Sequence, residues 1–215
     1  MKIAVVAPHP DDEVLGCGGT IKKYTQAGHD VFLCIVTKAY TPEWSEEFIK
    51  ERTKEIANSS KALGIKKVFN LDLPTVKLDT IPQKELNFKI GTVFSKIDPD
   101  IIYIPYGGDL NHDHQLMYEA CLVAARPGDN KIKKIFAYET PSETEWGIKP
   151  FVPNVYVDIK DTIDDKLKAM NCYKSEIRKY PHPRSLENIT ILSKKRGTEA
   201  GLLAAEVFKL IREIT

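Results

Sequence analysis

The stretch IAVVAPHPDDE, residues 3–13, decides the fold of this chain. Its first part, Ile3 to Ala7, is apolar at every position, as is typical of a parallel strand buried on both faces. Two prolines and three acids then end the strand, because proline cannot donate to a strand ladder and unpaired acids are costly to bury. Open α/β sheets place their ligand crevice at the carboxyl ends of such strands. The stretch therefore predicts a functional turn after a first parallel strand.

The turn carries the residue types of a metal site. Zinc binds histidine nitrogen and carboxylate oxygen, and a catalytic zinc keeps one position for water. His9 and Asp12 can supply two ligands, while Asp11 between them stays available as a general base. The alternative is a capped turn in which Asp11 or Asp12 serves as a helix N-cap and the other acids are solvated. The turn alone does not decide between them.

Length and composition favour one ordinary α/β domain over residues 1–215. Hydrophobic residues make up 42% and charged residues 28%, which is typical of a globular protein. The net charge of +1 predicts neither a nucleic-acid nor an anionic-membrane partner. No apolar run approaches the ~20 residues of a membrane span.

The cysteines and the N-terminus indicate the compartment. Cys17, Cys34, Cys121 and Cys172 are far apart, so we expect reduced, mostly buried thiols. The N-terminus leads directly into a strand and has no signal-peptide pattern. We therefore expect a cytoplasmic protein.

Apolar runs alternate with amphipathic segments along the chain. We expect strands at residues 3–7, 30–37, 67–73, 100–105, 132–140 and 155–159. We expect helices at residues 14–27, 46–62, 83–97, 115–126 and 198–214, with Ser45 as an N-cap. This alternation predicts βαβ units and a mainly parallel sheet.

The early glycines, Gly16, Gly18 and Gly19, are no nucleotide loop. A dinucleotide fingerprint needs its third glycine where Ile21 stands, and a phosphate-binding loop needs Gly-Lys-Ser/Thr. We expect these glycines to let the helix approach a strand or the acidic turn closely.

A second polar cluster, DLNHDH at residues 109–114, follows the fourth predicted strand. It occupies the same structural position as the first, because both lie at the carboxyl end of a parallel strand before a helix. Two His-Asp clusters at neighbouring strand ends can converge on one point. The second cluster therefore favours a shared metal site over two solvated turns, with a third ligand from this loop.

At these residues the chain resembles the LmbE-like (PIG-L) family of metal-dependent N-acetylglucosaminyl deacetylases. The resemblance covers nearly the whole chain, in segments that occur in the family's order. These segments are PHPDDEVLGCGGTI (8–21), Gly28-His29, DLNHDH (109–114), YETPSETEW (138–146), FVPNVYVDI (151–159), YPHPRS (180–185) and RGTEAGLLAAEVF (196–208).

The resemblance implies a Rossmann-like three-layer α/β sandwich that binds one zinc ion. It assigns His9, Asp12 and His114 as the metal ligands and Asp11 as the general base. Asp113 matches the acid that supports the second loop. Asp11 would take a proton from a metal-activated water, and Asp11 or a histidine would then protonate the departing amine.

One position departs from the family's H-x-D-H motif. Asn111 stands where the family has a histidine credited with stabilising the intermediate or protonating the amine. Asn111 itself, the adjacent His112 or the distant His182 can take over this role. We favour His182, because an imidazole can both donate to an oxyanion and return a proton.

Three arginines are candidate substrate contacts, because a guanidinium fork suits hydroxyl and phosphate groups. These are Arg52, Arg184 and Arg196, to which we add His112. Each can equally be a surface ion pair or an ordinary exposed residue. Trp146 can form an apolar platform for a sugar face or belong to the core.

The predicted function is zinc-dependent removal of an N-acyl group, expected to be acetyl, from an N-acetylglucosamine-type sugar or its conjugate. Other divalent transition metals suit the same ligands. Specificity is expected in loops 38–45 and 128–134, and relatives of this kind commonly form homo-oligomers. Two alternatives stay open: a non-catalytic sugar-binding relative and a metal-dependent phosphoesterase, which would need more ligands.

Overall fold

The computed structural model describes residues 1–128 and 130–215, and over these residues the strands form one seven-stranded sheet in the order β3-β2-β1-β4-β5-β7-β6. The strands are β1 Lys2–Ala7, β2 Asp30–Lys38, β3 Lys67–Pro74, β4 Ile101–Pro105, β5 Lys134–Tyr138, β6 Val155–Asp158 and β7 Ala205–Glu213. Strands β1 to β5 pair in parallel, whereas β7 is antiparallel to both β5 and β6. The prediction of a mainly parallel α/β sheet is confirmed.

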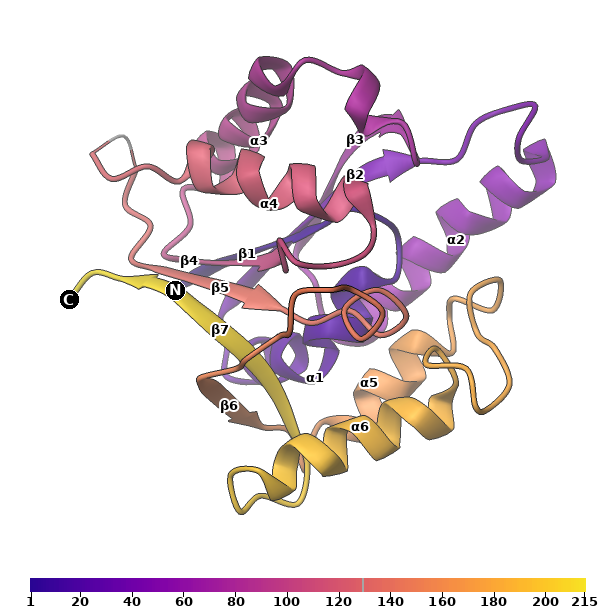
Figure 1. Cartoon of the computed structure of the whole chain (residues 1–215), viewed down its shortest axis with the longest axis vertical. Helices are drawn as coiled ribbons and strands as arrows, with labels where there is room; N and C mark the ends of the chain where they lie inside the picture. The colour runs from indigo at the N-terminus through magenta and orange to yellow at the C-terminus, as the bar shows by residue number, and fades with distance from the viewer. Residues whose placement is uncertain (129) are drawn as a thin grey trace.

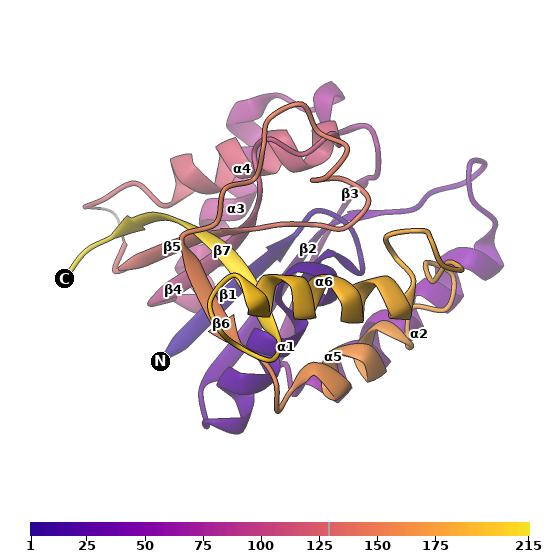
Figure 2. The same cartoon turned by 60° about the horizontal axis from the view of Figure 1, so that its bottom comes forward.

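Helices cover both faces of the sheet, which makes the expected three layers (Figure 1). The helices are α1 Asp12–Gln26, α2 Glu46–Leu63, the short 3-10 helix η1 Leu78–Thr80, α3 Gln83–Ile97, α4 His112–Ala124, α5 Ile163–Met170 and α6 Leu186–Thr198. Helices α3 and α4 lie on one face, and α1, α5 and α6 lie on the other, as the turned view also shows (Figure 2). In the part of the chain that the structure describes, no helix is both long and apolar enough to cross a membrane.

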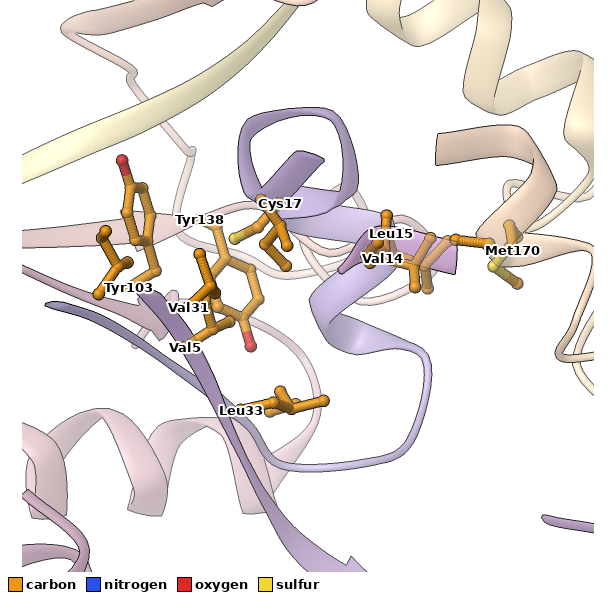
Figure 3. Packing of buried hydrophobic residues seen from close by; sticks show 14 of the residues in the cluster. Val5, Val14, Leu15, Cys17, Val31, Leu33, Tyr103, Tyr138 and Met170 are labelled. Atoms are coloured by element: carbon orange, nitrogen blue, oxygen red, sulfur yellow. The ribbon is translucent and has the colours of Figure 1, made fainter. Parts of the chain in front are cut away.

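The core consists of two clusters, one on each face of the sheet. Figure 3 shows the cluster beneath α1, where Tyr138 lies beside Val5 and Val31 and where Val14 faces Met170 of α5. The Tyr138 hydroxyl donates a hydrogen bond of 2.8 Å to the carbonyl of Val6, so its one polar atom is satisfied inside the core. This packing fixes α1 against the sheet directly below the acidic turn.

The early glycines lie where α1 approaches the strands. A Cβ on Gly16 would collide with the Tyr138 ring, and one on Gly19 would come within 2.8 Å of Ile159. The expected close approach of this helix to a strand is confirmed, since Tyr138 belongs to β5.

The crevice of the sheet lies between β1 and β4. Chain order runs from β1 outward to β3, then returns so that β4 pairs with the other side of β1. This reversal is the topological switch point at which open α/β sheets bind ligands. The two polar clusters of the sequence follow these two strands.

The C-terminal third differs from our expectation. The predicted helix at 198–214 is wrong: Ala205–Glu213 is strand β7, inserted between β5 and β6. Its side chains from Ala205 to Phe208 are all buried, so apolar residues occur on both faces of the strand and their spacing also fits a helix. We also predicted no element between residues 160 and 197, where α5 and α6 lie.

Candidate metal centre

Three predicted ligands meet at the switch point. His9 follows β1, Asp12 is the first residue of α1, and His114 lies in the first turn of α4. Both helices begin earlier than predicted, so Asp12 and His114 are held by helical backbone rather than by loops. One donor atom from each of the three residues lies within 4.8 Å of the others.

The spacing of these donor atoms fits a metal ion. His9 Nδ1 lies 3.5 Å from Asp12 Oδ2, and His114 Nε2 lies 3.3 Å from the same oxygen and 3.3 Å from His9 Nδ1. A zinc ion with ligand bonds of about 2.0–2.1 Å at tetrahedral angles separates its donors by about 3.4 Å. The three side chains therefore suit one tetrahedral metal ion with a fourth position left for water.

A carboxylate orients each imidazole. Asp113 Oδ2 lies 2.9 Å from His9 Nε2, and Asp109 Oδ2 lies 2.8 Å from His114 Nδ1. Carboxylates in this position fix the tautomer of a metal-binding histidine, so the opposite nitrogen is the one directed at the ion. This pattern supports a metal site over a pair of solvated turns.

The orienting acids are themselves held in place. The backbone amides of Val76 and Leu78 donate to Asp113 at 2.7 and 3.2 Å. Asp109 is buried and accepts a hydrogen bond of 2.6 Å from the Thr144 hydroxyl. Two loops distant in sequence thus brace the centre.

The charges of the site favour a cation. Burial lowers the pKa of His9, but hydrogen bonds to Asp113 and Asp12 outweigh it and raise the pKa to about 9. Burial likewise opposes protonation of His114, yet Asp12 and Asp109 raise its pKa to about 10. Burial raises the pKa of Asp12, but the two imidazoles outweigh it and hold the pKa far below its usual range. The surrounding carboxylates stabilise the protonated, positively charged form of both rings. A divalent cation would be stabilised by the same negative charges.

Asp11 has an unusual backbone and a buried oxygen that accepts no hydrogen bond. Its φ of 114° and ψ of −25° are rare for a residue with a side chain, and Glu13 stabilises this turn by accepting the Asp11 amide at 3.1 Å. Asp11 Oδ2 is buried without a hydrogen-bond partner. Burial, with the neighbouring Asp12, raises the pKa of Asp11, which suits a group that collects a proton. The side chain forms no helix cap, which argues against the capped turn.

A cavity of about 670 Å³ opens beside this centre. The predicted site residues that line it are His9, Asp11, Asp12, Asn111, Arg52 and Arg184. A volume of this size holds a small-molecule ligand.

The comparison with known families decides the identity of the fold. The family model for PIG-L, described as GlcNAc-PI de-N-acetylase, matches residues 4–125. This chain belongs to the PIG-L family. The match includes His9, Asp11, Asp12 and His114. It therefore covers all three predicted metal ligands and the predicted general base.

Individual relatives agree with the family. Diacetylchitobiose deacetylase of Thermococcus kodakarensis is 32% identical over 188 residues, which are 81% of this chain and 70% of that protein. The uncharacterized deacetylase YaiS of Escherichia coli is 30% identical over 182 residues, covering 80% of this chain and 90% of YaiS. Among solved structures, the conserved protein TT1542 from Thermus thermophilus superposes with a TM-score of 0.82 at 26% identity, covering 99% of this chain and 96% of that one.

Two of the three predicted substrate arginines reach the cavity of this PIG-L chain. Arg52 pairs with Glu176 Oε1, and Arg184 Nη1 lies 2.5 Å from Glu176 Oε2. Arg184 Nη1 also lies 3.7 Å from Asp11 Oδ2. Glu176 thus bridges two arginines beside the general-base candidate, a role that no local pattern in the sequence indicated.

The other predicted contacts lie elsewhere. Arg196 pairs with Glu139 at 2.5 Å and does not line the cavity, and His112 is exposed with its Nδ1 3.4 Å from Gln115. His182 is also outside the cavity lining, where its Nδ1 accepts the Arg184 amide at 3.1 Å. The roles assigned to these residues stay predictions that their positions do not favour.

Asn111, the departure from the family motif, is well placed. It lines the cavity and caps α4, with its side-chain oxygen accepting the Asp113 amide at 3.0 Å. Because the side-chain oxygen of Asn111 is used in this bond, its side-chain NH2 group is the part that can donate to a ligand.

The predicted specificity loops differ in outcome. Lys38, Ala39 and Trp44 of loop 38–45 line the cavity. No described residue of loop 128–134 does so, and residue 129 lies outside the described residues. Trp146 is 53% exposed and packs edge-on against His182, so it belongs to neither the core nor the cavity.

Asp109 and Glu13 support the metal centre and were not predicted, although each lies close to predicted site residues in the sequence. Asp109 lies inside the quoted DLNHDH motif, and a second carboxylate near two histidines is the expected partner of the second ring. Glu13 directly follows the ligand turn, and it is fully buried against the Tyr173 hydroxyl at 2.7 Å. Tyr173 could not be found from the sequence, because only the tertiary fold brings the segment after α5 to this turn.

Proposed function

We propose that this chain is a metal-dependent hydrolase that removes the N-acetyl group from an N-acetylglucosamine-type sugar or its conjugate. The observation that carries this proposal is the set of His9, Asp12 and His114 beside the buried carboxylate of Asp11, whose Oδ2 accepts no hydrogen bond. Membership of a family described as a de-N-acetylase supports the reaction class. The diacetylchitobiose deacetylase relative supports the substrate class.

His9, Asp12 and His114 would hold the ion, and a bound divalent transition metal lowers the pKa of water to about 7 and polarises a carbonyl. Zinc is our first choice, because two imidazoles and one carboxylate are a common zinc set. Manganese, iron, cobalt and nickel suit these ligands as well.

Asp11 supplies the proton transfers in this proposal. As a carboxylate it accepts a proton from the attacking water, and the same proton is needed later by the departing amine nitrogen. Arg184 lies 3.7 Å away and favours the charged form that accepts the proton. The fixed backbone of the turn keeps this carboxylate beside the ligands.

Asn111 is our candidate for stabilising the oxyanion. Its amide group can donate into the cavity, whereas His182 lies outside the cavity lining. A neutral amide can donate to an oxyanion but cannot return a proton, so Asp11 alone serves as base and then as acid. Arg52 and Arg184, which line the cavity, are our candidate contacts for sugar hydroxyls.

The test is metal-reconstituted deacetylation. Chelator-treated protein is loaded with Zn²⁺, Mn²⁺, Fe²⁺, Co²⁺ or Ni²⁺, and amine release is measured on N-acetylglucosamine, diacetylchitobiose and further conjugates. We expect one ion per chain and release of free amine and acetate. Two ions per chain with phosphate-ester cleavage would favour the phosphoesterase, and an inert protein without metal would favour the sugar-binding relative. The cytoplasmic location and a homo-oligomeric state stay predictions.

A further inference from the structure

The cavity continues beyond the metal ligands along one face of α2. Ile49, Thr53 and Ile56 follow helical spacing and line it from this helix. The apolar residues of the opposite wall are Ile35 of β2 and Val68 of β3, and Thr37 and Asn70 line the cavity from the same strands. In both views α2 lies on the side of the molecule where β2 and β3 end (Figures 1 and 2). We call the space between these walls the α2 groove.

The walls of the α2 groove belong to a rigid part of the molecule. Ile35 is buried, and Ile56 and Val68 are half-buried and pack against the core cluster beneath α1. Helix α2 is supported by α5 and α1. The groove is therefore a feature of the packed fold.

The aliphatic wall begins beside the reaction centre. Leu15 lines the cavity and lies one helical turn after Asp12 on α1, so its side chain neighbours that of Asp12, and Asp11 directly precedes this helix. An alkyl group attached to the carbonyl carbon would meet Leu15 first and then the α2 groove.

The polar side chains of α2 that line the cavity already have partners, since Arg52 pairs with Glu176 and the Thr53 hydroxyl donates to the Ile49 carbonyl. The other polar groups near the reaction centre lie on the opposite side of the cavity. Asn111, Ser142, Glu143 and Arg184 line the part contributed by the loops after β4 and β5 and by segment 171–185. A sugar ring needs such partners for its hydroxyls, and it would lose hydrogen bonds against an aliphatic wall. The two walls therefore sort the two sides of an amide: the sugar amine toward the polar loops and the acyl chain toward the α2 groove.

We propose that the α2 groove binds the alkyl chain of an N-acyl group longer than acetyl. This inference rests on the proposed function and extends its substrate class to N-acyl amino sugars of medium chain length. In the reaction, water adds to the acyl carbon, the carbon–nitrogen bond breaks, and a free fatty carboxylate and a free amine are released.

The first experiment compares chain lengths. N-acetyl-, N-butyryl-, N-hexanoyl- and N-octanoylglucosamine are hydrolysed by the metal-loaded protein, with octyl β-N-acetylglucosaminide as the probe of an apolar aglycone. Each methylene that is fully buried is worth about fourfold in affinity, so kcat/KM should rise by about two- to fourfold per methylene. The kcat/KM of the octyl glycoside should exceed that of N-acetylglucosamine by less than about threefold.

A pair of variants locates the effect. Ala57 lines the groove from α2 and is exposed, so Ala57→Trp fills the groove without disturbing the core. Lys61, one turn later, is exposed and is not among the lining residues, so Lys61→Trp is the matched control. The ratio of octanoyl to acetyl kcat/KM should fall towards one in Ala57→Trp and stay unchanged in Lys61→Trp.

Binding of octanoate and acetate, measured calorimetrically on the metal-loaded protein, gives a readout independent of turnover. Octanoate should bind at least about tenfold more tightly, and Ala57→Trp should abolish the difference. Equal binding and a flat chain-length profile would overturn the α2 groove while leaving acetyl hydrolysis, and thus the proposed function, intact.

The remaining outcomes also decide the occupant. A higher kcat/KM for the octyl glycoside than for the long N-acyl compounds would overturn the acyl assignment. It would show that the groove binds an apolar aglycone instead. A Trp-sensitive self-association without chain-length preference would give it to a second copy of the chain. Metal binding without hydrolysis of any compound would defeat the proposed function, and the octanoate titration would still decide the groove.

Discussion

The ligand-bearing region, β1 through α4, and the bracing region, β6 through β7, contribute differently to this molecule. The first holds the three predicted ligands and Asp11 at the switch point of a parallel sheet. The second adds an antiparallel strand, packs α5 against α1, and packs α6 against α5 and β7. The family model matches residues 4–125, which is nearly the first region alone. The comparison teaches that the predicted ligands and Asp11 come from one part of the chain, whereas the second part braces α1 and adds Glu176 and Arg184 to the rim of the same cavity.

The bracing region reaches α1 through buried charges. Glu206 of β7 accepts the amides of Gly19 and Thr20 at 2.9 and 2.7 Å. Lys166 of α5 donates to Glu206 at 2.6 Å and to the Leu15 carbonyl at 2.8 Å. Since Asp12 is the first residue of α1, these contacts fix the helix that carries a ligand.

The largest effect is expected in the ligand-bearing region. His114→Ala removes one of three ligands, and we expect metal affinity and activity to fall by at least about 10³-fold. The fold should persist, because the core clusters do not use this side chain. Metal content by mass spectrometry and circular dichroism check both points. A variant that retains one tightly bound ion would contradict the ligand assignment.

A second prediction concerns the bracing region. Glu206→Ala leaves the Lys166 ammonium buried and unpaired, so we expect a loss of about 3–5 kcal/mol in the free energy of unfolding. The double variant Glu206→Gln with Lys166→Met should recover part of this loss, because no buried charge remains. Urea titration measures both. If Glu206→Ala lost its metal without losing stability, the claim that β6 through β7 mainly stabilise the fold would be contradicted.

The orienting carboxylates give a smaller, sharper test. Asp109→Asn preserves the size of the side chain but weakens its hold on His114, so we expect metal affinity to fall by about 10–100-fold. Competition with a coloured chelator measures this change. Asp79→Asn, at an exposed acid outside the cavity lining, is the control and should change nothing. An Asp109 variant with parental affinity would deny that this acid supports the centre.

The smallest effect separates two arginines that the sequence treated alike. Arg184 lines the cavity and Arg196 does not. Arg184→Met should raise KM for an amino-sugar substrate by about tenfold, as expected from the loss of a charged hydrogen bond. Arg196→Met should leave KM within about twofold of the parent. Equal effects of the two substitutions would show that the cavity is not the substrate site.

The sequence predicted the ligand-bearing region well, because its signals are local. The apolar run before His9 and the repeated His-Asp clusters specify both a parallel strand and the position of a site. Asp113 was expected to support its loop, and it holds His9 and residues 76–78.

The bracing region was predicted poorly, for a physical reason. A strand buried on both faces has apolar residues at successive positions, so β7 was indistinguishable from a buried helix by spacing. Glu206 and Lys166 are 40 residues apart, and no local rule pairs them. Glu176, which joins Arg52 and Arg184, was missed for the same reason.

The most direct test of the central claim is the activity of Asp11→Asn with its metal content measured in the same sample. Removing the proton acceptor while keeping the shape of the side chain should lower kcat by at least about 10²-fold, in line with general acid–base catalysis. The variant should still bind one ion per chain, because Asp11 is not among the three ligands. Full activity with metal bound would contradict the assignment of Asp11 as the general base and, with it, the proposed mechanism.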